Sequence, residues 1–79
     1  AWLDVVANDV PKGTFLLYLS GGDVWIAAED LERVGLVVTG GERVERAGRS
    51  LVSLASLSNL LSFRLEEAAL TVRITARPP

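Results

Sequence analysis

The sequence predicts an α+β fold: one small mixed or antiparallel sheet of about six short strands with two short helices, in a single domain over residues 1–79. Three observations predict it. The 79 residues suffice for only one small core. Short apolar runs bounded by Gly, Pro and Asn-Asp are typical of strands. Two segments carry apolar side chains at helical spacing.

The first strands follow from the opening residues. Leu3–Ala7 is predicted as a short strand that ends in the turn formers Asn8-Asp9 and Pro11-Lys12-Gly13. Thr14–Leu19 is apolar on both alternating faces, a pattern typical of a central strand covered on both sides. Ser20–Asp23 contains a Gly-Gly pair and predicts a hairpin into a strand over Val24–Ile26.

The next segment predicts a helix of about two turns over AAEDLERVGL. Acidic residues stand where its first turn would be, and Gly35 stands where it would end. The side chains expected on its sheet-facing side are Ala27, Leu31 and Val34.

The second half continues with a loop over Val37–Gly48 that holds a short strand near Arg43–Glu45, then a strand over Leu51–Ser53. Leucines at helical spacing predict a second short helix over about residues 54–60. The segments Ser62–Glu66 and Leu70–Ala76 predict the clearest hairpin. The sequence also contains a weak internal repeat, which we call the internal echo, in VWIAAEDL and LVSLASL. In each segment a leucine follows an aliphatic strand residue by five positions: Leu31 follows Ile26, and Leu57 follows Val52.

Composition argues against several classes of function. The chain has no cysteine and no histidine, so thiolate chemistry, a histidine base and the commonest metal ligand are absent. Its five serines between Ser50 and Ser62 have only Lys12 as a candidate base, and we expect no enzyme and no catalytic residue. The net charge of −2 argues against nucleic acid. The longest apolar run, Phe15–Leu19, is too short to span a membrane.

Other candidate sites are better explained by structure than by ligands. Gly21-Gly22 precedes a strand instead of a helix, so a turn is a better interpretation than a phosphate loop. The acids Glu29, Asp30 and Glu32 point in different directions on a helix, so we predict no metal site and no cofactor. The arginines at positions 43, 46 and 49 alternate with acids, which favours a solvated loop over an anion site.

The two tryptophans are the strongest candidates for contact with a partner. If Val24 and Ile26 face the core, Trp25 faces outward, where a partner would have to cover it. The alternative places a second helix or the terminal segment of this domain over Trp25, and the sequence leaves both open. Trp2 stands at the very start of the chain.

The order of these features resembles a known family. The stretch LDVVANDVPKGTFLLYLSGGDVWIAAEDLERVGL resembles the opening of the N-terminal periplasmic domain of outer-membrane ushers, which assemble fimbriae and other surface fibres. LVSLASLSNLLSFRLEEAALTVRITARPP continues the resemblance with a strand, a leucine-bearing turn and a hairpin. Together they cover nearly the whole chain, and the start and the Arg-Pro-Pro end suggest a piece of a longer protein.

This resemblance implies a non-catalytic docking domain on the periplasmic face of the bacterial outer membrane. In ushers the domain is the first docking site for a periplasmic chaperone that carries a fibre subunit, and it adjoins the remainder of the usher chain without itself spanning the membrane. Two departures stand out: only Ala1 and Trp2 precede Leu3, where ushers have a chaperone-binding tail, and the cysteine pair of some members is missing. The residues we expect to contact the partner are Trp2, Leu3 and Trp25.

An alternative resemblance lies in the second half. Its strand, helix and hairpin are similar to the repeat of copper amine oxidase N-terminal-like domains, which are found as stalks on secreted bacterial proteins. That resemblance implies a cell-wall-binding or spacer module. The Pro11-Lys12-Gly13 stretch fits ushers better.

Overall fold

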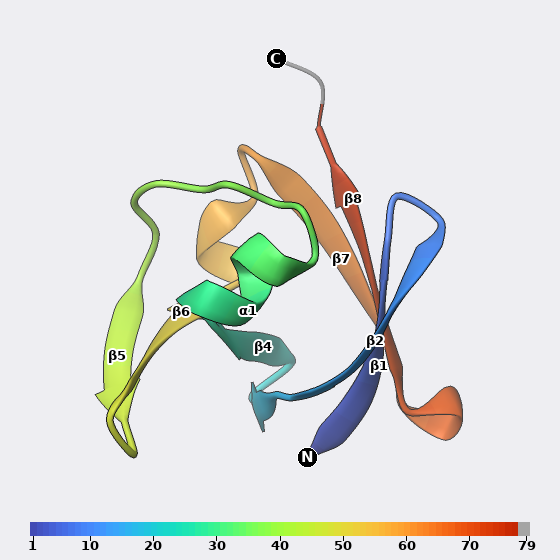
Figure 1. Cartoon of the computed structure of the whole chain (residues 1–79), viewed down its shortest axis with the longest axis horizontal. Coiled ribbons are helices and arrows are strands. Elements are labelled where there is room, and N and C mark those ends of the chain that lie inside the picture. Colours follow the sequence, from blue (N-terminus) through green and yellow to red (C-terminus); the bar gives the residue numbers. More distant parts are fainter. Residues whose placement is uncertain (78–79) are drawn as a thin grey trace.

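The computed structural model describes residues 1–77 (Figure 1), and Pro78 and Pro79, which close the predicted domain, lie outside the described residues. The described chain forms eight strands in two four-stranded sheets. In spatial order the first sheet contains β2 (Val10–Leu16), β1 (Trp2–Ala7), β8 (Thr71–Ala76) and β7 (Leu61–Glu66). The second sheet contains β3 (Tyr18–Ser20), β4 (Asp23–Ala27), β6 (Arg49–Ser53) and β5 (Arg43–Arg46).

The predicted α+β fold with one sheet and two helices is therefore wrong, because the described chain is mostly β. Residues 1–77 contain one α-helix, α1 (Ala28–Arg33), and two 3₁₀ turns, η1 (Ala55–Leu57) and η2 (Glu67–Ala69). The predicted helix over 54–60 shortens to η1. There the Ser53 hydroxyl accepts the Ser56 N–H at 3.1 Å, and the Ser56 hydroxyl donates to the Ser53 carbonyl at 2.7 Å. Such local side-chain bonds compete with helical bonding.

The predicted central strand over Thr14–Leu19 is also wrong. The chain leaves the first sheet after Leu16 and enters the second at Tyr18, so the apolar run supplies the outer strands β2 and β3 of two different sheets. Leu17 lies between them and is fully buried, whereas Leu19 is 43% exposed. The run is apolar on both faces because it crosses the core at Leu17.

The predicted turn at Pro11–Gly13 lies instead within β2. Gly13 stands opposite Val5 and Pro11 opposite Val6, so Lys12 is the extra residue of a β-bulge. The turn at Asn8-Asp9 is confirmed, and both residues have positive φ, 50° and 66°, as the tightest hairpins require.

The Gly21-Gly22 hairpin is confirmed. Ser20 pairs with Asp23 across the two glycines, whose φ values of 57° and 85° suit them to this two-residue turn.

The helix predicted over AAEDLERVGL is confirmed as α1. It ends in a Schellman motif, in which the Leu36 N–H donates to the Leu31 carbonyl at 3.1 Å and the Gly35 N–H donates to the Glu32 carbonyl at 2.9 Å. Its predicted inner side is buried, with Ala27, Leu31 and Val34 at most 2% exposed.

The short strand near Arg43–Glu45, the strand over Leu51–Ser53 and the final hairpin are confirmed as β5, β6 and the β7–β8 pair. The internal echo has a structural counterpart. Strands β4 and β6 pair antiparallel with Ile26 opposite Val52, and each leads into a helical turn, α1 or η1, that buries Leu31 or Leu57.

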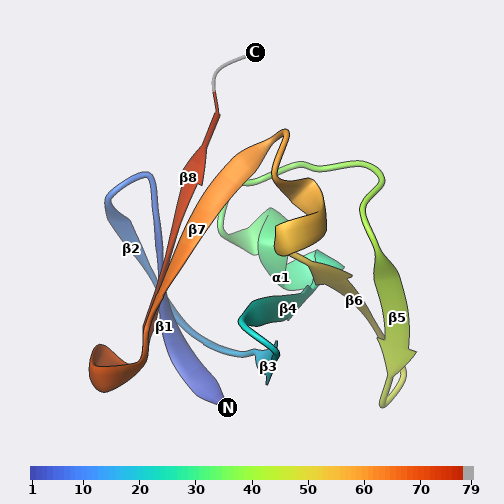
Figure 2. The same ribbon diagram turned by 180° about the vertical axis from the view of Figure 1, so that it is seen from behind.

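One core lies between the two sheets. Strands β1 and β8 run parallel at the centre of the first sheet and β4 and β6 form the centre of the second, as the two sides of Figure 2 show. Helix α1 packs on β4 and β6. The central strands alternate buried and exposed residues, as in strands with one covered face. The fully buried aliphatic residues include Leu3, Val5, Leu17, Val24, Ile26, Leu31, Leu51, Val52, Leu54, Leu57, Leu61, Val72 and Ile74.

Candidate docking surface

The three residues predicted to contact a partner lie in different surroundings. Trp2 begins β1 and remains 65% exposed. Leu3 is 1% exposed, because the alternation of β1 turns it into the core. Trp25 lies on the face of β4 opposite the buried Val24 and Ile26 and is half-buried. A partner can therefore reach Trp2 and Trp25 but not the Leu3 side chain.

Trp2 lines a shallow groove that we call the Trp2 groove. Its volume is about 240 Å³, and it lies between β1, β2, α1 and the start of β6. The apolar side comes from Trp2 and its cross-strand partner Leu16. The charged side comes from Asp30, Arg33 and Arg49. Trp and Arg are the residue types most enriched at the centres of protein interfaces, so this combination suits a protein partner.

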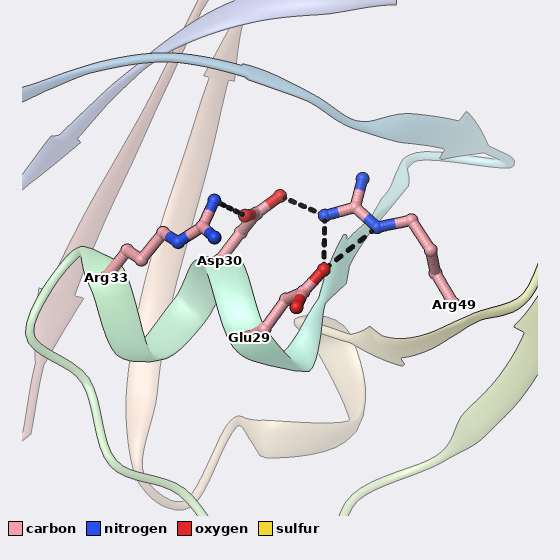
Figure 3. Close-up of polar contacts among 4 residues, drawn as sticks. All are labelled: Glu29, Asp30, Arg33 and Arg49. Carbon is pink, nitrogen blue, oxygen red and sulfur yellow. Dashed lines mark hydrogen bonds and ion pairs between the residues drawn. The ribbon is translucent and has the colours of Figure 1, made fainter.

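The charged side is an ion network between α1 and Arg49, the first residue of β6 (Figure 3). Arg33 and Arg49 approach the Asp30 carboxylate from opposite sides, with N–O distances of 3.2 and 2.8 Å. Arg49 also donates two hydrogen bonds to Glu29 Oε1, at 3.0 and 3.2 Å. The Asp30 side chain is 5% exposed, whereas that of Arg33 is 68% exposed. The two guanidinium groups thus share one buried carboxylate at the groove wall.

These contacts define the electrostatics of the groove. Hydrogen bonds from Arg49 to Asp30, and secondarily to Glu29, raise the pKa of the Arg49 guanidinium above its ordinary value. Arg49 is therefore permanently charged, and it holds α1 to the first residue of β6. Arg33 donates one hydrogen bond to Asp30 through a single nitrogen, and most of its side chain remains exposed to solvent. Its other N–H groups can therefore bind an acidic group of a partner.

Trp25 lines a second depression, the Trp25 groove, with a volume of about 690 Å³. Both outer strands of the second sheet, β3 and β5, contribute to it, and the guanidinium carbon of Arg46 lies 5.7 Å from the centroid of the Tyr18 ring. Tyr18 stands opposite Trp25 in the β3–β4 pair, which places two aromatic rings on the same wall. Val44 of β5 adds an apolar surface that is 43% exposed. The groove around Trp25 is thus lined by strands of its own sheet and by Ala1, and η1, which replaces the predicted second helix, does not line it.

The two grooves meet along one stretch of backbone. The Ala1 amino group donates to the Leu17 carbonyl at 2.8 Å, and the Leu17 N–H donates to the Ala1 carbonyl at 2.8 Å. Leu16 lines the Trp2 groove, while Ala1 and Tyr18 line the Trp25 groove. The segment that crosses between the sheets therefore separates two adjacent candidate docking surfaces.

Sequence reasoning missed a hydrogen-bond cluster centred on Asp23. Its carboxylate accepts the N–H groups of Val24 at 2.7 Å and Ala55 at 3.0 Å, and it also accepts the Ser53 hydroxyl proton. Ser56 extends the cluster, because its hydroxyl accepts the Glu42 N–H at 2.8 Å. The only signal in the sequence is an Asp directly after a Gly-Gly turn. These serines connect segments of backbone and show no arrangement suited to nucleophilic attack.

The other candidate residues have structural roles in the described chain. Arg43 and Arg46 are exposed on β5, and Arg49 belongs to the ion network. Across residues 1–77, acidic side chains do not gather into a group that could hold a metal ion. Within the same residues, none of the helices has the length and apolar character that crossing a membrane requires.

Comparison with protein-family models, with characterised proteins and with solved structures finds no match to this chain.

Proposed function

We propose that this chain is a non-catalytic docking domain of an outer-membrane usher, which captures periplasmic chaperone–subunit complexes for fibre assembly. The observation that carries the proposal is Trp2, a large aromatic residue that is 65% exposed beside an arginine-rich groove wall. Exposed tryptophan is costly to leave in water and is a frequent anchor of interfaces. The ordered resemblance to ushers supplies the identity of the partner and the periplasmic location.

The geometry supports a division of roles within the docking surface. Trp2 would supply the apolar anchor, and Arg33 would pair with an acidic group of the chaperone or subunit. Trp25 lies on the far side of the Ala1–Leu17 backbone pair and would widen the contact. Leu3 would act indirectly, because it holds the start of β1 in the core.

The proposal predicts that Trp2→Ala weakens capture of the chaperone–subunit complex by about 10- to 100-fold, the usual cost of truncating an interface anchor. Titration calorimetry with the chaperone–subunit complex, and with free chaperone, measures this. We expect the complex to bind more tightly than free chaperone. The thermal midpoint should barely change, because Trp2 is outside the core.

Val37→Ala is the matched control, because Val37 is 85% exposed and lines neither groove. It should bind like the unmodified domain. Absence of binding heat for the unmodified domain would refute the docking role. The genomic context is a second test: we expect the coding sequence to continue into barrel strands beside a chaperone gene, whereas a single anchor or a peptidase domain would favour the spacer module.

A further inference from the structure

Strand β5 leaves one edge of the second sheet open. It pairs with β6 on one side and is the last strand in the sheet order. Figures 1 and 2 both show it at the periphery, with no other element of the described chain beyond it. All four of its residues, Arg43 to Arg46, are exposed. An open edge of this kind presents backbone groups that can pair with another strand.

The pairing with β6 determines which backbone groups point outward. The Glu42 carbonyl accepts the Ser53 N–H at 2.9 Å, so Glu42 bonds toward β6. Alternate residues of an antiparallel strand bond to opposite sides, so Val44 and Arg46 also bond toward β6. The N–H and C=O groups of Arg43 and Glu45 therefore face the open edge.

The sequence of this edge is complementary in charge to itself. The order Glu42-Arg43-Val44-Glu45-Arg46 places opposite charges at equal distances from Val44. In an antiparallel pair with a two-fold axis at Val44, Arg43 faces Glu45 of a second copy and Glu45 faces its Arg43. Both are residues whose backbone groups point outward, so the register that pairs the charges also pairs the hydrogen bonds.

We propose that two copies of this chain associate through β5 in this antiparallel register and form one continuous eight-stranded sheet. Four backbone hydrogen bonds join Arg43 and Glu45 of the two copies, and the side chains of these residues pair on one face of the sheet. Val44, which is 43% exposed, meets Val44 of the second copy on the other face. This association does not depend on the proposed docking function.

The other open edges fit a second copy less well. In the first sheet, β2 contains Pro11, which has no N–H to donate, and the bulge at Lys12 interrupts its ladder. In the second sheet, β3 has only three residues. In the fourth outer strand, β7, the Leu60 carbonyl accepts the Arg77 N–H, so the backbone groups of Arg64 and Glu66 bond toward β8 and not toward the open edge. Of the four outer strands of the described chain, β5 is thus the one that combines an unbroken ladder with opposite charges on residues whose backbone groups face outward.

Charge reversal tests the register directly. In Arg43→Glu both edge positions are acidic, and in Glu45→Arg both are basic, so each variant should associate with itself at least tenfold more weakly than the unmodified chain. An equimolar mixture of the two variants restores both opposite-charge pairs and should associate about as tightly as the unmodified chain. Sedimentation equilibrium at protein concentrations up to about 1 mM measures the dissociation constant in each case.

Lys12→Glu and Glu32→Arg are matched controls, because they alter net charge by the same amounts at exposed sites away from β5. Each should self-associate like the unmodified chain, and thermal midpoints establish that all four variants fold. The proposal is overturned if the unmodified chain stays monomeric up to about 1 mM. It is also overturned if the mixture of Arg43→Glu and Glu45→Arg associates no better than either variant alone.

Discussion

Asp23 joins three segments of backbone through a single carboxylate. It receives hydrogen bonds from its own strand, from Ser53 at the end of β6 and from Ala55 at the start of η1. A carboxylate that accepts several such bonds lets the chain end β6 and turn into η1 without leaving N–H groups unpaired. The hairpin at Gly21-Gly22 is thereby attached to the second half of the chain.

Gly41 provides a test at the same scale. It has a φ of +82°, and a Cβ atom there would lie 2.7 Å from Leu57 Cδ2 and 3.2 Å from Val52 Cγ2. Gly41→Ala therefore combines backbone strain with overpacking, and we expect a loss of about 2–4 kcal/mol in unfolding free energy. Urea unfolding measures the loss.

Gly40→Ala separates the two causes. Gly40 has a similar φ of +78°, but an added Cβ would meet nothing within 4 Å. Only the strain of about 1–2 kcal/mol should remain. Equal losses in the two variants would show that the contact with Leu57 has no cost.

The residue-scale features were the least predictable from sequence. The sequence predicts Asp30 as an acidic residue of the first helical turn, and the structure confirms that position, but its partner Arg49 is 19 residues away. The Asp23–Ser53 contact spans 30 residues. Such contacts depend on the β4–β6 register, which a single sequence with few long apolar runs does not determine.

At the scale of elements, α1 is too short to be stable through helical propensity alone. It has six residues and no side-chain cap at its start, so packing of Leu31 and the ion network must hold it in place. Asp30 supplies the central carboxylate of that network. The stability of this helix is therefore a property of its contacts with β4 and β6.

Asp30→Asn tests this dependence. It removes the charge that Arg33 and Arg49 share, and we expect a loss of about 1.5–3 kcal/mol in unfolding free energy. Glu29→Gln is the control, because Glu29 is 62% exposed and should cost less than about 1 kcal/mol. Chemical denaturation of both variants gives the comparison, and similar losses would argue that Asp30 is not the centre of the network.

The pH dependence of this effect follows from Arg49. Its pKa is raised in the folded state, so its contribution is fully present below the unfolded-state pKa and is lost only as pH rises through the folded-state value. The difference between Asp30→Asn and the unmodified chain should therefore stay constant from about pH 6 to 9. A marked decline within that interval would indicate another titrating group.

Elements were more predictable than residues, and the exceptions have a common physical origin. The Asn8-Asp9 and Gly-Gly turns, α1 and the final hairpin each depend on local signals and were predicted correctly. The run over Thr14–Leu19 was misread, because a strand covered on both faces and a chain that crosses a core at Leu17 have the same apolar pattern. Pro11-Lys12-Gly13 was misread because bulges and turns use the same residues.

At the scale of the molecule, each sheet contains one tryptophan. Trp2 belongs to the first sheet and Trp25 to the second, while a single core joins the two sheets. We expect one cooperative unfolding transition. In Trp2→Phe the remaining fluorescence reports on the second sheet, and in Trp25→Phe it reports on the first.

Within each variant, the urea midpoint from fluorescence should coincide with that from far-ultraviolet circular dichroism. Separate midpoints would mean that one sheet can unfold while the other persists. The division of the strands between two sheets could not be predicted from the sequence. The chain passes from the first sheet to the second at a single residue, Leu17, and no Gly or Pro beside it marks the end of a strand.

The parallel pairing of β1 with β8 has a consequence for how the domain is made. The centre of the first sheet can form only when residues 4–7 pair with residues 71–74, which lie near the other end of the chain. Contacts this distant in sequence close slowly, because the entropy of a long loop is lost before the pairing compensates for it. A chain that emerges from a ribosome or a translocation channel N-terminus first would therefore remain open, with Leu3 and Val5 in water, until its final strand arrives. Its early strands would depend during that interval on whatever protects unfolded chains in the compartment where it folds.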